Sequence, residues 1–182
     1  DDCVWGGMVD AKMATALTGR NGQALEDYKK RLLKLNNQVV AQAPEDLVIN
    51  THVCRGNYHS TFFSSGAYDS VADLLFGEEN VNAYYLEYDD KRSGGFAPLA
   101  KVSGDKKVVL GLITTKIPQL EDKGKVIARI HEAEKYVPLD RLYLSPQCGF
   151  ASCEIGNKLT EEEQWEKLKL VKEIAEEVWG DR

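Results

Sequence analysis

The sequence predicts an α/β protein with a parallel sheet. Short apolar runs with the composition of strands alternate along the whole chain with segments of helical periodicity. Because two parallel strands need a connection that crosses back over the sheet, this alternation favours strand-helix-strand units over hairpins. Polar residues of metal-binding type also recur where successive strands end, which is typical of a barrel. Four such strands predict about half of an eight-stranded (β/α)8 TIM barrel, with an open parallel sheet as the competing architecture.

The first half of the chain supplies a long helix, a strand and a short helix. Residues 22–42 have apolar side chains at helical spacing, and the helix ends before Pro44. Residues 46–54, DLVINTHVC, have the length and composition of a strand, and residues 69–77 form a short helix after a loop. The apolar positions of the long helix are Leu25, Tyr28, Leu32, Leu35 and Val39.

The second half continues the alternation. Thr160 and Glu163 form a capping-box pattern at the start of the final helix. The pair Asp1-Asp2 is a candidate for the end of a fifth strand. The remaining elements are strands at 82–89, 106–114 and 140–147, a glycine-rich connection at 90–99 and a helix at 120–137.

Length, charge and cysteine content limit the function classes. The 182 residues suffice for one domain, which we place at 1–182, although a chain that opens at Asp1 without Met is expected to be a piece of a longer protein. A net charge of −6, without a basic run, excludes nucleic acid and membranes as expected partners. No apolar run approaches the roughly 20 residues that span a bilayer, and four scattered cysteines fit a reducing cytoplasm.

Four side chains at predicted strand ends have the chemistry of a metal site. In a strand, residues two apart face the same side, so His52 and Cys54 converge on one point. Alone, this pair is better explained as two buried side chains. Glu87 and Cys148 also lie where strands give way to loops, and the carboxyl ends of parallel strands meet at one edge. Two thiolates, an imidazole and a carboxylate favour Zn²⁺ over magnesium or calcium.

These residues stand in motifs that resemble the cobalamin-independent methionine synthases, whose catalytic half is a (β/α)8 barrel with a single zinc. The resemblance covers nearly the whole chain and is closer to the compact single-barrel relatives than to the long two-barrel enzyme. The matching motifs are THVC with His52 and Cys54, LEYDD with Glu87, SPQCGFAS with Cys148, and the closing LTEEEQWEKL.

The resemblance implies a zinc-dependent methyltransferase. It implies that His52, Cys54, Glu87 and Cys148 bind the metal, which takes up the sulfur of homocysteine. The thiolate then attacks the methyl group of methyltetrahydrofolate, and methionine is formed. Asp1 aligns with an aspartate that pairs with the amino group of the substrate, unless it is a frayed chain end. We expect Glu87, the hardest donor, to yield its place to the substrate sulfur.

The sequence departs from the family pattern in two places. Where the family has a histidine that protonates the departing folate, this chain has GLITTKIPQLE, and Lys116 stands near that position as an alternative acid or as a solvated loop charge. Four or five strands also cannot close a barrel, so we expect self-association or a missing barrel half. Two alternatives therefore stay open: a related alkyl-thiol transferase with a different methyl donor, and a non-catalytic zinc-binding fragment.

Overall fold

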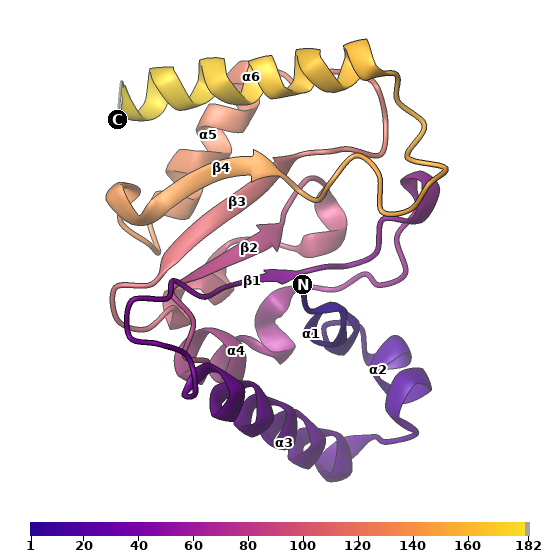
Figure 1. Cartoon of the computed structure of the whole chain (residues 1–182), viewed down its shortest axis with the longest axis vertical. Helices are drawn as coiled ribbons and strands as arrows, with labels where there is room; N and C mark the ends of the chain where they lie inside the picture. Colours follow the sequence, from indigo (N-terminus) through magenta and orange to yellow (C-terminus); the bar gives the residue numbers. More distant parts are fainter. Residues whose placement is uncertain (181–182) are drawn as a thin grey trace.

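The computed structural model describes residues 1–180 and contains one parallel sheet in which the strands follow one another in chain order (Figure 1). Each strand pairs in parallel with its successor, from Asn50 opposite Ala83 to Ile113 opposite Pro146. The sequential order requires a crossover between every pair of neighbours. The strands are β1 (Asn50–Val53), β2 (Ala83–Glu87), β3 (Lys107–Ile113) and β4 (Leu142–Pro146).

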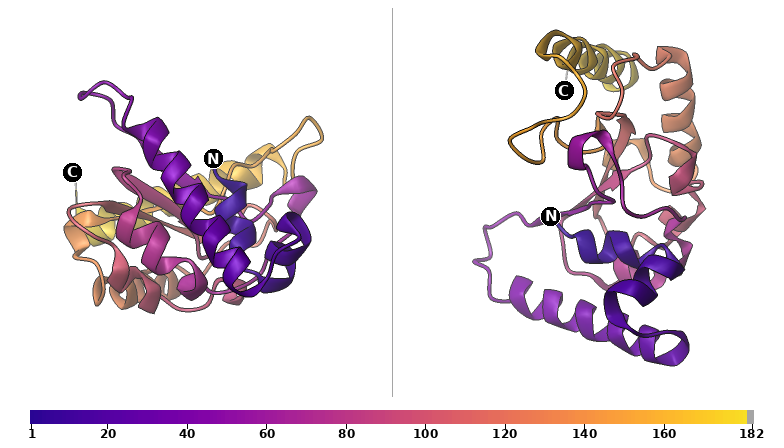
Figure 2. Two further views of the ribbon diagram at one scale, coloured as in Figure 1. Left: turned by 90° about the horizontal axis from the view of Figure 1, so that it is seen from below. Right: turned by 90° about the vertical axis from the view of Figure 1, so that its right-hand side faces the viewer.

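The helices form an arc around one side of the sheet and leave the other side open (Figure 2). α6 begins at the capping box predicted for Thr160 and Glu163, in which both hydrogen bonds are present. Two short helices precede the long helix at the start of the chain. The helices are α1 (Cys3–Met8), α2 (Ala11–Thr18), α3 (Gly22–Val40), α4 (Ala72–Glu78), α5 (Lys123–Glu134) and α6 (Glu161–Trp179).

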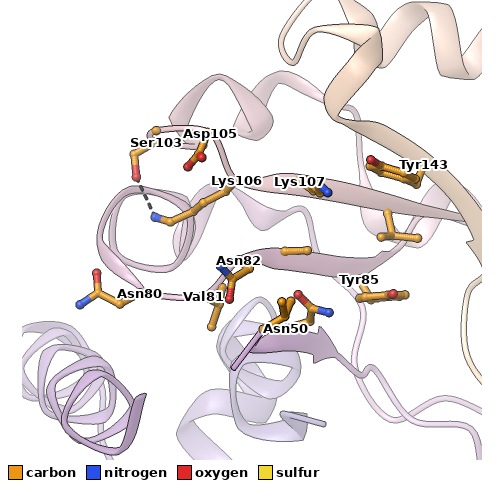
Figure 3. Close-up of a pocket in the computed structure, with 14 residues that line it drawn as sticks. Asn50, Asn80, Val81, Asn82, Tyr85, Ser103, Asp105, Lys106, Lys107 and Tyr143 are labelled. Atoms are coloured by element: carbon orange, nitrogen blue, oxygen red, sulfur yellow. Dashed lines mark hydrogen bonds between the residues drawn. The ribbon is translucent and has the colours of Figure 1, made fainter. Parts of the chain in front are cut away.

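The two faces of the sheet differ in burial. Tyr84, Leu86 and Leu110 point toward the helices and are at most 1 % exposed. On the opposite face, which we call the inner face, Tyr85 and Tyr143 each remain 38 % exposed (Figure 3). A hollow of about 680 Å³ lies at the amino ends of the strands on this side. The inner face is where the remaining strands of a closed barrel would pack.

This arrangement confirms the predicted fold class. A doubly wound open sheet has a strand order that reverses and helices on both faces, whereas here the order is β1-β2-β3-β4 and the helices cover one face. The chain is therefore an α/β half-barrel of the TIM type. No helix within residues 1–180 combines the length and the apolar character needed to cross a membrane.

Some predicted boundaries and faces were wrong. The strand expected at 46–54 is only β1, because the sheet pairing starts where Asn50 meets Ala83, and Leu47 and Val48 ahead of it are exposed. In α3 the buried positions are Lys29 and Leu33, whereas Leu35 and Val39 point to solvent.

The pair Asp1-Asp2, the candidate for the end of a fifth strand, lies outside the four strands and directly precedes α1. The side chain of Asp2 accepts hydrogen bonds from the main-chain nitrogens of Val4 and Trp5 and so caps the helix. The nitrogen of Asp2 donates one bond, 2.7 Å long, to the carbonyl of His52 in β1. The start of the chain thus contacts the edge of the sheet at β1 and then continues into the helix.

Candidate metal centre

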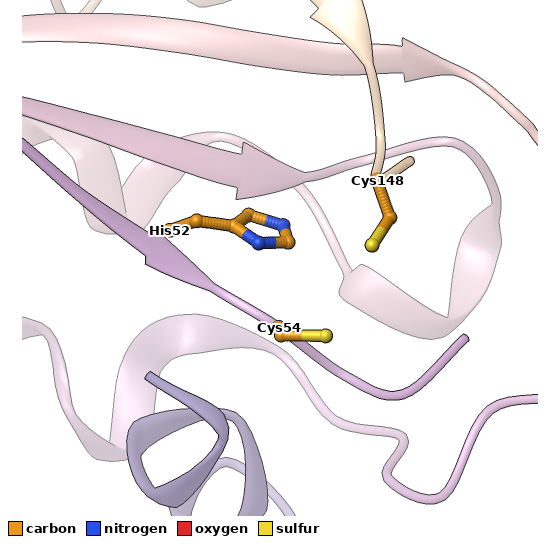
Figure 4. Close-up of side chains that lie close together, drawn as sticks. All are labelled: His52, Cys54 and Cys148. Carbon is orange, nitrogen blue, oxygen red and sulfur yellow. The ribbon is translucent and has the colours of Figure 1, made fainter. Parts of the chain in front are cut away.

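Three of the four predicted ligands meet at the carboxyl edge of the sheet. One ligand atom each from His52, Cys54 and Cys148 lie within 4.8 Å of one another (Figure 4). His52 is in β1, Cys54 follows its last residue and Cys148 follows the end of β4. Strands at opposite edges of the sheet thus supply the cluster, as expected from the alternation of side chains and from the common edge of parallel strands.

Both ring nitrogens of His52 face oxygen atoms. Nδ1 lies 2.8 Å from a carboxylate oxygen of Asp1, and Nε2 lies 3.0 Å from the main-chain oxygen of Gln147. A carboxylate at one nitrogen is the usual way to fix the ring of a metal-binding histidine. Asp1, which is exposed, therefore orients His52 in this structure.

The pKa values of the Cys54 and Cys148 thiols shift in opposite directions because the two side chains interact. The hydrogen bond between them lowers the pKa of Cys148, and the nearby His52 acts in the same direction. The same bond, with burial, raises the pKa of Cys54. The main-chain nitrogen of Gly56, which has φ +96°, donates to the sulfur of Cys54 across 3.4 Å. The two sulfurs lie close enough together to serve as a donor pair for a soft divalent cation.

Glu87 lies beside the cluster and is bound by other groups. Its side chain is fully buried, and Oε1 lies 3.9 Å from Nε2 of His52. Oε1 accepts a hydrogen bond of 2.7 Å from the main-chain nitrogen of Arg55, and Oε2 forms a 2.9 Å ion pair with Arg92. The carboxylate stands outside the group of three donors, within the reach of a small side-chain shift.

Gln147 joins the ends of β3 and β4 next to the cluster. Its side-chain oxygen accepts a hydrogen bond from the nitrogen of Thr115, and its side-chain nitrogen donates to the hydroxyl of the same residue. Its main-chain nitrogen donates to Ile113 and continues the ladder. These bonds fix the backbone from which Cys148 projects.

Lys116 is buried and bound, so the alternative of a solvated loop charge is wrong. Only 7 % of the residue is exposed. Its amino group donates to the main-chain oxygen of Gly56 at 3.0 Å and to Oδ1 of Asn57 at 2.8 Å. Burial lowers the pKa of Lys116, although the carboxylates of Glu87 and Asp89 oppose this effect.

The donor set fits zinc. Two sulfurs and an imidazole nitrogen within a few ångströms of one another are the ligand types that Zn²⁺ prefers, and a carboxylate is at hand for the fourth position. Cys54 also belongs to a second group with the exposed Asp1 and Cys3, whose ligand atoms are equally close. Cys153 belongs to neither group.

A parallel half-barrel with a group of His and Cys side chains at its carboxyl edge places the protein among TIM-barrel proteins that carry their site at this edge. A family model described as the catalytic domain of cobalamin-independent synthases matches residues 24–177. The chain belongs to this family, the cobalamin-independent methionine synthases, as the motifs around the cluster predicted.

Relatives of this chain are found in bacteria and archaea. The uncharacterized protein YxjG of Bacillus subtilis is 46 % identical over 180 residues, which are 98 % of this chain and 47 % of that protein. A methionine synthase of Pyrococcus abyssi is 27 % identical over 101 residues, or 56 % of this chain and 26 % of that one. The chain thus spans about half the length of the Bacillus relative.

Solved structures show the same architecture. A protein of Listeria monocytogenes assigned as a vitamin-B12 independent methionine synthase superposes with a TM-score of 0.73 and 38 % identity, covering 100 % of this chain and 48 % of that one. A B12-independent methionine synthase of a Shewanella species, solved with selenomethionine, has a TM-score of 0.63 and 21 % identity, covering 80 % of this chain and 42 % of that one. The latter supports the fold alone.

Two residues at the site were not predicted from the sequence. Arg92 pairs with Glu87, and Asn57 links Lys116 to the carbonyl of Gly149 through a side-chain bond of 2.6 Å. The signals for them were weak: an arginine after the acidic pair of LEYDDKR, and an asparagine just past the THVC motif.

Proposed function

We propose that this chain is the zinc-carrying part of a methyltransferase that moves a methyl group from a methyltetrahydrofolate-type donor to homocysteine and forms methionine. The convergence of His52, Cys54 and Cys148 at the carboxyl edge carries the proposal. Membership of the family supports it, because the matched residues 24–177 include all four expected ligands.

In this proposal His52, Cys54 and Cys148 hold zinc, with Glu87 as the fourth donor. When bound, zinc supplies Lewis acidity that turns an incoming thiol, with an ordinary pKa of about 8.5, into a thiolate at neutral pH. Asp1 keeps the imidazole of His52 in place and offers its exposed carboxylate to the amino group of the amino-acid substrate. Glu87 would be the donor that gives way to the substrate sulfur, since it lies outside the group of three donors.

Lys116 is the proposed proton donor to the departing methyl carrier. A lysine serves as an acid near neutral pH only if its pKa falls, and burial lowers the pKa of Lys116. Lys116 also lines a hollow of about 420 Å³ between the loops that follow β1, β2 and β3, with Phe62 and Asp89 on its other walls. A flat ring system of the donor fits such a mixed apolar and acidic hollow.

We further propose that a complementary set of strands covers the inner face and completes the barrel. Tyr85 and Tyr143 are partly exposed there, and β1 and β4 are the edges of the four-stranded sheet. Exposed strand edges and aromatic side chains favour association. A further part of a longer chain, or a second copy of this one, would supply these strands.

The absorption spectrum of the metal-loaded protein, recorded with and without homocysteine, tests this function. We expect cobalt, used as a visible substitute for zinc, to show a sulfur-to-metal absorption band whose intensity and position change when homocysteine is added. Methionine, which lacks the thiol, serves as the matched ligand control and should leave the early spectrum unchanged. A spectrum that homocysteine does not alter would exclude the enzyme interpretations and favour a non-catalytic zinc-binding module.

A further inference from the structure

Arg92 holds the carboxylate of Glu87 in a fixed position beside the metal centre. It lies in the short turn Lys91–Ser93 after β2, and its side chain is 4 % exposed. The guanidinium forms ion pairs with Glu87 at 2.9 Å, with Asp89 at 2.7 Å and with Asp90 at 2.5 Å. It also stacks over the ring of Phe62, 4.9 Å from the centroid. One buried cation thus serves three carboxylates.

Both carboxylate oxygens of Glu87 accept hydrogen bonds. Its Oε2 is bound to Arg92, and its Oε1 accepts from the main-chain nitrogen of Arg55. The side chain of Arg55 forms no ion pair with Glu87; its Nε donates to Tyr68 and its Nη1 donates to Gly66. Arg92 is therefore the side-chain cation that pairs with Glu87 among the described residues.

We propose that Arg92 is a positioning residue that competes with bound zinc for the carboxylate of Glu87 and receives it when a thiol enters. The inference rests on the proposed function, because it presumes a zinc site that exchanges a ligand. The exchange would replace the oxygen of Glu87 by the substrate sulfur as a metal ligand and would release the thiol proton to solvent. The displaced carboxylate then pairs with Arg92.

A buried carboxylate explains why such a partner is needed. Glu87 is completely excluded from solvent, and an unpaired charge in that environment is strongly unfavourable. Arg92 gives the carboxylate a cation to pair with when it leaves the metal, so no uncompensated charge is created. Arg92 thereby weakens the metal bond of Glu87 and eases the entry of the thiol.

Zinc and thiol affinities of the whole chain test the inference. Zinc affinity is measured by competition with a chromogenic chelator, and homocysteine affinity by titration of the cobalt-loaded protein. We expect R92Q to bind zinc about 3–10-fold more tightly and homocysteine weaker by a similar factor, because a charge-assisted hydrogen bond no longer competes. R92K should recover most of the wild-type behaviour. Unchanged or weaker zinc binding by R92Q would show that Arg92 is merely structural.

Two backgrounds separate this competition from a general charge effect. K91Q removes an equal charge at the exposed neighbouring residue and should leave both affinities unchanged. In E87Q, which has no carboxylate to release, the additional R92Q substitution should no longer tighten zinc binding. If R92Q tightens zinc binding equally in the E87Q background, the effect is a through-space one and the inference is wrong.

If R92Q does not fold, D90N provides a second test of the competition between Arg92 and zinc. Asp90 is 49 % exposed and shares the guanidinium, so D90N leaves Arg92 freer to bind Glu87. We expect weaker zinc binding and tighter homocysteine binding in D90N, and neither effect in the D90N/E87Q double variant. Equal effects of D90N with and without Glu87 would overturn the inference.

The inference and the proposed function fail in different ways. A wild-type chain that binds zinc and responds to homocysteine, with unresponsive Arg92 variants, overturns the inference alone. A wild-type chain that binds no zinc, or whose metal ignores homocysteine, overturns both.

Discussion

Gly6 of α1 lies directly against the main-chain carbonyl of Cys54. A Cβ atom added to Gly6 would lie 1.8 Å from that oxygen and 2.8 Å from the carbonyl carbon. Through this contact α1 packs against the end of β1. The hydroxyl of Ser64 donates a 2.7 Å hydrogen bond to the carbonyl of Gly6. The position of the Cys54 sulfur thus depends on the absence of a side chain at residue 6.

Replacing Gly6 by alanine should therefore displace the backbone of Cys54. We expect G6A to lose about 1–3 kcal/mol of unfolding free energy, as for overpacked cores, and to bind zinc more weakly. Urea denaturation and chelator competition measure the two effects. G95A is the matched control, because nothing lies within 4 Å of the corresponding Cβ position. Wild-type stability and zinc affinity in G6A would contradict the close contact.

Cys148 should be necessary for metal binding, whereas Cys153 should not. Cys148 belongs to the three-residue donor group, and Cys153, five residues later, does not. Removing the hydrogen-bond partner of a metal ligand lowers metal affinity by roughly 10–100-fold. We expect C148S, which removes a ligand itself, to lower zinc affinity by more than this. C153S should keep the wild-type value. Bound zinc per chain after gel filtration measures both, and full occupancy in C148S would refute its assignment as a ligand.

Most of the fold could be predicted because its signals are local. The apolar runs of β2, β3 and β4 and the capping box of α6 each depend on neighbouring residues. The donor cluster was predictable for a related reason: side-chain alternation in β1 and the common edge of parallel strands bring together residues that are distant in sequence.

The errors concern features that depend on packing. The strand expected at 46–54 is shortened because Leu47 and Val48 have no neighbouring strand, which the apolar composition does not reveal. The burial of Lys116 depends on Asn57, which lies 59 residues away in the chain. The partner of Glu87 was missed because arginine after two aspartates is common on solvated loops.

The stability contributed by Lys116 should depend on pH. Burial lowers its folded pKa below the ordinary value of 10.5, so between these two values the unfolded chain binds more protons than the folded one. Stability therefore rises with pH across this window. We expect the wild type to gain unfolding free energy relative to K116M as the pH increases toward 10.5.

Urea denaturation of both proteins at several pH values between neutrality and pH 10 measures this difference. K125M, at an exposed lysine, shows how much of the change comes from removing any lysine. The quantity of interest is the unfolding free energy of the wild type minus that of K116M. If it stays constant or falls as the pH rises, the pKa of Lys116 is not lowered by burial.

Lys167 should anchor α6 to the loop that carries Lys116. Its side chain is fully buried, and its amino group donates to the carbonyl of Gln119 at 2.7 Å and to both oxygens of Glu121 at 3.1 Å. Glu121 in turn accepts from the nitrogen of Thr114 at the end of β3. We expect K167M to cost about 3–5 kcal/mol of unfolding free energy, because it leaves a half-buried carboxylate without its cation.

The same helix offers a matched control. Lys172 pairs with Glu176, but the two side chains are 75 % and 50 % exposed, so K172M should change stability by no more than about 0.5 kcal/mol. The double variant K167M/E121Q should recover part of the loss of K167M, because no unpaired charge remains. A loss for K167M as small as that for K172M would show that the buried pair does not anchor the helix to the loop that carries Lys116.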